Sequence, residues 1–310
     1  MTAASATSGI SEKVQLKVET DYGDGGAGAA ITEVLIRKLA WTADAHVSAN
    51  YSVDGTSLAN TLTDGVLSFN GNIDAYITDG RELTYVLGGA VTGASPNFAI
   101  AVANTLPSFG FLAVNDSGTS NNVNGKGFKV SKCSIKGSRG NKVEMNLDIV
   151  GQDIVTSETA ISAGTSTTKP FVDLDAVMTI NGGTAVSLED FSLNIDRGTE
   201  TRRGIESASE NEKRLISSAI EKKLTVTGSA TGIADELIYQ SILGGSTIED
   251  YRTEANIVLT LTNNTNIIVF TTSALVSVVG RDSGAEDDLM IMKFDFVGKS
   301  IAITGTYTAE

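Results

Sequence analysis

The sequence predicts a mainly β protein: two tandem β-sandwich or barrel domains, each with a short flanking helix. Three observations predict this class. Pro is scarce (3 residues) and Gly abundant (32 residues) in a chain of 310, which suits short strands joined by tight turns. Segments in which apolar and polar residues alternate, typical of half-buried strands, recur along the chain. A unit at residues 67–89 also occurs a second time at 224–245.

The two copies of this unit read LSFNGNIDAYITDGRELTYVLGG and LTVTGSATGIADELIYQSILGG. Each begins with an alternating segment that contains a Gly and ends in Leu-Gly-Gly. Two further landmarks follow in the same order, KVSKCSIKG against SALVSVVG and IVGQDI against FVGKSI. The glycines that mark the three matches are Gly71 with Gly228, Gly137 with Gly280, and Gly151 with Gly298. We therefore predict a duplication.

The domain boundaries follow from composition. Residues 1–20 begin with a run of small and polar residues and are expected to form an N-terminal arm. Residues 156–170, TSETAISAGTSTTKP, are rich in Ser and Thr and predict a linker. The two domains would then span residues 21–155 and 171–310.

In the first domain, strands are predicted at five places, and the pair at the end reads as a hairpin closed by SRGN. The weak helix of this domain is DGRELTYVL. The predicted strand regions are 35–53, 66–72, 97–106, 128–137 and 142–151.

In the second domain, a long hairpin turns at Asn181, Gly182 and Gly183. A helix is predicted at 234–243, because apolar residues share one side and Gly244 can end it without a Cβ clash. The remaining predicted strands are 223–229, 255–261, 266–280, 289–298 and 300–309.

A search for chemistry finds no catalytic, metal or cofactor site. The net charge of −14 offers no basic surface for gripping nucleic acid. The single cysteine, Cys133, cannot form a disulfide within the chain, and the single histidine, His46, is assigned a structural or surface role. The acidic clusters DYGDGG and DSGAEDD lack the spacing of an EF-hand loop and read as solvated turns. GGAGAA and LGGAVTG lack a phosphate-loop ending and also read as turns.

The chain carries no sign of export or membrane insertion. Its start, MTAASATSGISEK, lacks a basic region followed by an apolar run. No apolar stretch is long enough to span a bilayer. We therefore expect a soluble protein that matures in the cytoplasm.

The most unusual element is a long polar segment of mixed charge at 197–214, whose expected counterpart in the first domain, residues 54–64, is shorter. Two interpretations remain open: a floppy surface loop, or a projecting arm that orders on an acidic surface of another subunit. Opposed charges would set the register between partners in the second case. The charged residues of the segment are Arg197, Glu200, Arg202, Arg203, Glu206, Glu210, Glu212, Lys213 and Arg214.

From residue 30, and most clearly after residue 165, the chain resembles the tail tube proteins of long-tailed bacteriophages and related viruses. The resemblance rests on SLEDFSLNIDRG, the long charged segment after it, KKLTVTGSATGIADELIYQSILGG, and the paired strands that follow. It is similar to the type in which two tube domains are fused. The first domain departs from this pattern in its short loop and weak helix.

The resemblance implies a structural protein of the virion tail, assembled in the host cytoplasm. It implies stacked rings, with three chains and six tube domains in each, and a hollow tube that viral DNA crosses without specific binding. The 197–214 segment would bridge stacked rings. Further partners implied are the tape measure, tail terminator and distal tail proteins, and no cofactor or membrane is implied.

The alternatives are an inner tube subunit of a contractile injection system, a two-domain β-sandwich adhesin or binding module, and a hydrolase with two carboxylates. The duplication favours a viral tail over the usually single-domain injection tube. An adhesin would predict exposed aromatic residues, whereas aromatic residues make up 6% of the chain with one Trp, Trp41.

Overall fold

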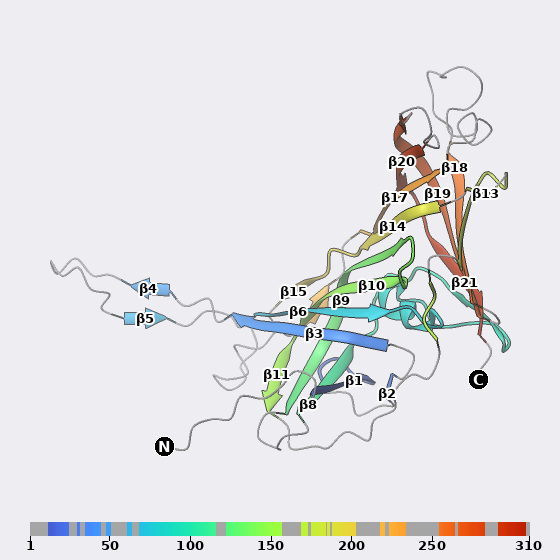
Figure 1. Ribbon diagram of the computed structural model, residues 1–310. Coiled ribbons are helices and arrows are strands. Elements are labelled where there is room, and N and C mark those ends of the chain that lie inside the picture. Colours follow the sequence, from blue (N-terminus) through green and yellow to red (C-terminus); the bar gives the residue numbers. More distant parts are fainter. Residues whose placement is uncertain are drawn as a thin grey trace.

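The computed structural model confirms a mainly β protein with antiparallel strands throughout its described part (Figure 1). It describes residues 12–24, 30–31, 35–44, 48–50, 61–63, 68–115, 122–156, 169–172, 175–183, 185–186, 188–202, 218–220, 223–233, 254–263, 266–282 and 291–307.

The first half of the chain forms two sheets that share a core. One sheet has the order β3-β6-β10-β9, and the other has the order β2-β1-β8-β9-β11. The long strand β9 belongs to both. The bounds are β1 (Glu12–Val18), β2 (Ala30–Ile31), β3 (Leu35–Asp44), β6 (Ser68–Tyr76), β8 (Phe109–Asn115), β9 (Val123–Ser138), β10 (Glu144–Gly151) and β11 (Asp153–Thr156).

The second half repeats this pattern of pairing. Strands β14, β17, β20 and β19 pair in that order, as β3, β6, β10 and β9 do. Strands β13, β12 and β18 follow beside β19, as β2, β1 and β8 lie beside β9, and β21 takes the place of β11. The bounds are β12 (Ala176–Ile180), β13 (Ala185–Val186), β14 (Leu188–Asp196), β17 (Thr225–Ile233), β18 (Ala255–Asn263), β19 (Asn266–Asp282), β20 (Ile291–Gly298) and β21 (Ala302–Thr306).

Irregularities of the strands repeat as well. The β3–β6 register shifts at Arg37, and the β14–β17 register shifts at Glu189. The β9–β10 register shifts at Ser131, and the β19–β20 register shifts at Ser277. Because a β-bulge adds one residue to a strand, these four positions align the two halves residue by residue.

This alignment confirms two of the three expected landmarks and corrects the third. Gly71 and Gly228 take equivalent places, because the residue opposite Gly71 on β10 and the residue opposite Gly228 on β20 are themselves equivalent. Gly151 and Gly298 do the same. The expected match of Gly137 with Gly280 is wrong. Counted from the shared bulge, Gly280 takes the place on β19, opposite β20, that Ser134 takes on β9, opposite β10.

Both halves carry a small two-stranded sheet at the same point of the chain order. In the first half it consists of β4 (Ser48–Asn50) and β5 (Thr61–Thr63), which extend away from the main sheets (Figure 1). In the second it consists of β15 (Glu200–Arg202) and β16 (Ser218–Ile220). We call these pairs the arms. Residues 200–202 of the 197–214 segment therefore form the first strand of the second arm, and residues 61–63 of its expected counterpart form the second strand of the first arm.

Helical structure in the first half is short, as expected: the 3-10 turn η2 (Arg81–Leu83) leads into α1 (Thr84–Leu87). Gly88 ends the helix at φ 86°, a conformation that suits Gly. The predicted helix at 234–243 lies outside the described residues, as does most of the predicted linker.

Two expectations for the first half need correction. Residues 12–18, placed in the N-terminal arm, instead form β1 and pair along their whole length with β8. The strand expected at 97–106 is shorter, since β7 (Asn97–Ile100) ends before the bridge at Val102.

The two halves join through strand pairing. β9 pairs with β14 from Lys132 to Ser138, and β7 pairs with β21. Through the first of these joints, a run of eight strands forms in the order β3-β6-β10-β9-β14-β17-β20-β19. The backbone of one half thus completes the hydrogen bonding of the other.

Several glycines within strands lie beneath phenylalanine rings. A Cβ at Gly228 would lie 2.2 Å from the Phe296 ring, and one at Gly137 would lie 2.3 Å from the Phe191 ring. Gly125 lies in the same way against Phe111, and Gly151 against Phe128. The absence of a Cβ lets each ring pack onto the backbone of the neighbouring strand.

Candidate functional site

The eight-strand run has one apolar face and one polar face. Side chains alternate between the two faces, so buried residues such as Ile73, Met145 and Ile195 point into the core. The residues between them are half-buried or exposed and form what we call the polar face. Its members include Asn72, Asp74, Lys132, Ser134, Lys136, Glu144, Asn146, Asp148, Asp190, Ser192, Asn194, Asp196, Thr225, Thr227, Lys293 and Asp295.

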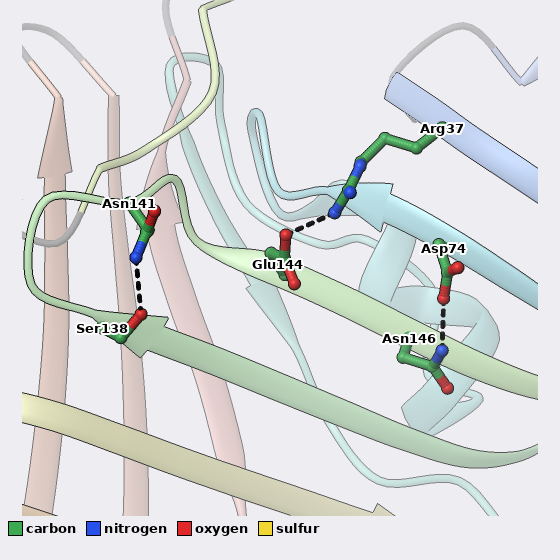
Figure 2. Close-up of polar contacts among 6 residues, drawn as sticks. All are labelled: Arg37, Asp74, Ser138, Asn141, Glu144 and Asn146. Carbon is green, nitrogen blue, oxygen red and sulfur yellow. Dashed lines mark hydrogen bonds and ion pairs between the residues drawn. The ribbon is translucent and has the colours of Figure 1, made fainter.

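Two Asn-x-Asp triplets, one on β6 and one on β10, lie at the centre of the polar face. Asn72 on β6 and Asn146 on β10 exchange amide hydrogen bonds, with Nδ2 to Oδ1 distances of 2.9 and 3.1 Å. Asn72 Nδ2 also donates to Asp148 Oδ1 at 3.0 Å, and Asn146 donates to Asp74 (Figure 2). These side-chain bonds tie neighbouring strands together on the solvent side.

Charged and polar pairs extend this network to both sides. Arg37 on β3 reaches past β6 to pair with Glu144 on β10 (Figure 2). At the β9–β10 turn, Asn141 Nδ2 donates to Ser138 Oγ at 2.9 Å. Across the joint between the halves, Lys132 Nζ lies 3.5 Å from Asp196 Oδ2.

Shallow hollows run along the polar face. One, at the joint of the halves, is lined by Lys132, Ser134, Asn146, Asp148 and Asn194 among others. It contains one cation, Lys132, and two carboxylates, Asp148 and Asp196, and neither a histidine nor an exposed thiol. A surface of this composition suits passing contact with solvent and counterions, because a polyanion is held by clustered Lys and Arg.

Sequence reasoning missed the polar face, although a signal was present. The triplets Asn72-Ile73-Asp74, Asn146-Leu147-Asp148 and Asn194-Ile195-Asp196 share one pattern on three different strands. Two of the carboxylates recur at equivalent places in the two halves: Asp148 corresponds to Asp295, and Asp196 to Asp44.

The predicted contact residues of 197–214 divide into a base and an arm. Arg197 lies at the base, only 2% exposed, and its Nη2 donates to the Ala103 carbonyl at 2.7 Å. Its backbone N–H donates to the Ser131 carbonyl at 2.8 Å, and Thr199 Oγ1 donates to the Val130 carbonyl at 2.9 Å. These bonds fix the start of the arm to β9.

The other predicted contact residues lie beyond this base. Glu200 is exposed at the start of β15, and Arg202 ends that strand. The residues Arg203, Glu206, Glu210, Glu212, Lys213 and Arg214 lie outside the described residues.

The residues considered for catalysis or metal binding form no site in the described part of the chain. Cys133 is buried, and burial together with the Glu82 carboxylate raises the pKa of its thiol far above the usual range. Asp24 Oδ2 accepts the backbone N–H groups of Thr20 and Asp21, as in a turn. His46 lies outside the described residues.

Two features are absent from the described residues. No group of three or more His, Cys, Asp or Glu side chains among them is arranged to hold a metal ion. None of their helices has the length and apolar character to cross a membrane.

Comparison with known proteins identifies a family for nearly the whole chain. Among curated proteins, none matches the sequence. A family model described as phage tail tube protein matches residues 9–306, which includes both halves, both arms and every strand of the polar face. The chain therefore belongs to the phage tail tube protein family.

Proposed function

We propose that the protein is the subunit of a viral tail tube, which assembles with copies of itself into stacked rings whose hollow centre conducts viral DNA. The observation that carries this proposal is the family match over residues 9–306, on a chain that has a continuous sheet with one polar face. The role is structural and needs no catalytic group.

We place the polar face toward the channel. Two of its carboxylates recur at equivalent positions in the two halves, so a ring would present them as repeated circles of negative charge. DNA phosphates are repelled by such a wall and are not retained during passage. The Asn and Ser side chains between the carboxylates hydrogen-bond to water and keep the channel wall hydrated.

The repeated pairing pattern supports a ring of three chains that presents six tube units. Each half would act as one tube domain, and the charged second arm would bridge to the next ring. The tape measure, tail terminator and distal tail proteins are the further partners of such a tube, assembled in the host cytoplasm and retained in the virion tail.

Electron microscopy of the concentrated purified protein tests the assembly. We expect hollow filaments with three-fold or six-fold end views. A protein that stays monomeric at every concentration would contradict the proposal.

Charge reversal tests the orientation of the polar face. Asp148→Lys with Asp295→Lys should leave tubes intact and slow DNA delivery, because the new cations hold phosphate. Asp21→Lys, an exposed carboxylate in the turn after β1, is the matched control. Equal infectivity of the double variant and the control would place the polar face elsewhere.

A further inference from the structure

Three Asn-Gly pairs occur in the chain, and they lie in two kinds of backbone. Asn70–Gly71 belongs to β6, which pairs with β3 on one side and with β10 on the other. Asn124–Gly125 belongs to β9 and lies between β8 and β11. Asn181–Gly182 is the exception, because it forms the turn between β12 and β13, and both of its residues are exposed.

This turn is of type I′, the hairpin turn that Asn-Gly favours. Asn181 has φ 53° and Gly182 has φ 68°, and the Gly183 N–H donates to the Ile180 carbonyl at 3.0 Å. The space beside Gly182 is open, since a Cβ placed there would meet no atom within 4 Å. Solvent therefore reaches the peptide bond that joins Asn181 to Gly182.

A hydrogen bond holds the Asn181 side chain and makes its amide carbon more reactive. Oδ1 accepts the backbone N–H of Asn256 at 2.8 Å, and the Asn181 N–H donates to the Asn256 carbonyl at 2.8 Å. A donor at Oδ1 withdraws electron density from Cγ, and it stabilises the negative charge on Oδ1 when a nucleophile adds to Cγ. The backbone nitrogen of Gly182 is such a nucleophile, because its attack on Cγ closes a five-membered ring and Gly has no side chain to shield it.

We propose that Asn181 is a self-modification site, at which the folded protein converts the side-chain amide into a carboxylate with water as the only co-reactant. The Gly182 nitrogen loses its proton to solvent and bonds to Asn181 Cγ. The Cγ–Nδ2 bond breaks, and Nδ2 takes a proton from solvent and leaves as ammonia, which gives a succinimide. Water then opens this ring at Cγ to give aspartate, or at the backbone carbonyl carbon to give isoaspartate.

The modification changes the turn in two ways. Either product adds a negative charge to the segment from Asn181 to Val186, which contains no charged residue. The isoaspartate product also adds one carbon atom to the backbone, so it breaks the hydrogen bond between Ile180 and Gly183 and shifts the contact with Asn256. The end of β12 is then less firmly tied to β18. None of this depends on the proposed tube function.

The two Asn-Gly pairs in strands are protected by their ladders. Attack on Cγ requires the backbone of the pair to rotate, and in β6 and β9 this rotation breaks hydrogen bonds to two neighbouring strands. At the turn, the backbone pairs with β18 on one side and is exposed. Opening a paired core strand costs more free energy than opening a turn. We therefore expect Asn181 to convert at least about tenfold faster than Asn70 and Asn124, which is a difference of about 1.4 kcal/mol in the barrier.

Peptide mapping by mass spectrometry of the unmodified protein tests the site. During incubation at mildly alkaline pH, the peptide with Asn181 should gain the mass of an amide-to-acid conversion, and an isoaspartyl methyltransferase assay should detect isoaspartate there. In urea, all three Asn-Gly pairs should convert at similar rates, because no turn or ladder remains. Conversion of Asn181 no faster than that of Asn70 and Asn124 in the folded protein would overturn the inference. A preference that persists in urea would also overturn it, since the fold would not be its cause.

The variant Gly182→Ala tests the nucleophile, because the added methyl group shields the nitrogen and disfavours φ 68°. Conversion of Asn181 should slow about tenfold, which corresponds to about 1.4 kcal/mol. Gly140→Ala is the matched control, since Gly140 has φ 81° and equally open space but lies in another turn. Its conversion rate at Asn181 should equal that of the unmodified protein. An unchanged rate in Gly182→Ala would refute attack by the Gly182 nitrogen, and the mapping of the unmodified protein decides the site even if this variant does not fold.

Discussion

Replacing Gly228 with alanine should destabilise the protein, because the new methyl group would occupy the space of the Phe296 ring. The added Cβ would lie 2.2 Å from Phe296 Cζ. Carbon atoms prefer separations of about 3.5–4.0 Å, so the ring must withdraw by more than about 1 Å. Phe296 is 3% exposed, and the small void beside it, lined by Leu193, Ile257 and Phe270, cannot receive the displaced ring.

The magnitude follows from two opposing terms. Overpacking of this kind costs about 1–3 kcal/mol. Alanine is favoured over glycine within a strand by about 0.5–1 kcal/mol, which offsets part of that cost. Gly280→Ala is the matched control, since it is also a strand glycine but its Cβ meets the nearest atom at 3.9 Å. The two variants should therefore differ by about 1–3 kcal/mol in the free energy of unfolding.

Urea unfolding followed by circular dichroism, at concentrations where the protein is monomeric, measures this difference. The midpoint for Gly228→Ala should lie below that of the unmodified protein, and the midpoint for Gly280→Ala at or above it. In thermal unfolding, the two variants should differ by roughly 2–6 °C for a chain of this size. Equal midpoints would show that the ring does not depend on the missing Cβ.

Three further predictions concern the base of the second arm, the arm itself and the buried thiol. Arg197→Ala should destabilise the protein by about 1.5–3 kcal/mol in urea unfolding, because the Ala103 carbonyl loses a charged donor, whereas the exposed Glu200→Ala should change it little. Deletion of residues 199–212 should leave a folded protein that forms no long tubes in electron micrographs, and normal tubes would refute the role of that arm. Cys133 should react with a thiol reagent only on unfolding, and rapid labelling of the folded protein would contradict this. The free energy of unfolding should fall as pH rises above about 8.5, because the unfolded thiol ionises there while the folded thiol keeps its proton.

The sequence by itself determined the strand content and the duplicated order of events. Alternation with a period of two is a local property, so β6, β10 and β18 could be placed from their own residues. Gly182 and Gly88 marked turns for an equally local reason, since their positive φ angles suit glycine.

Only the tertiary structure decided which strands meet and which polar residues gather. The alignment of Gly280 with Ser134 depends on a bulge at Ser277, which no local pattern announces. Arg197 looked like part of a charged surface segment but is buried. Its backbone N–H donates to β9, and its guanidinium donates to the Ala103 carbonyl. The three Asn-x-Asp triplets form one face only because their strands lie close together in the run. Long-range pairing is set by the packing of the whole chain, and the residues of one strand do not contain that information.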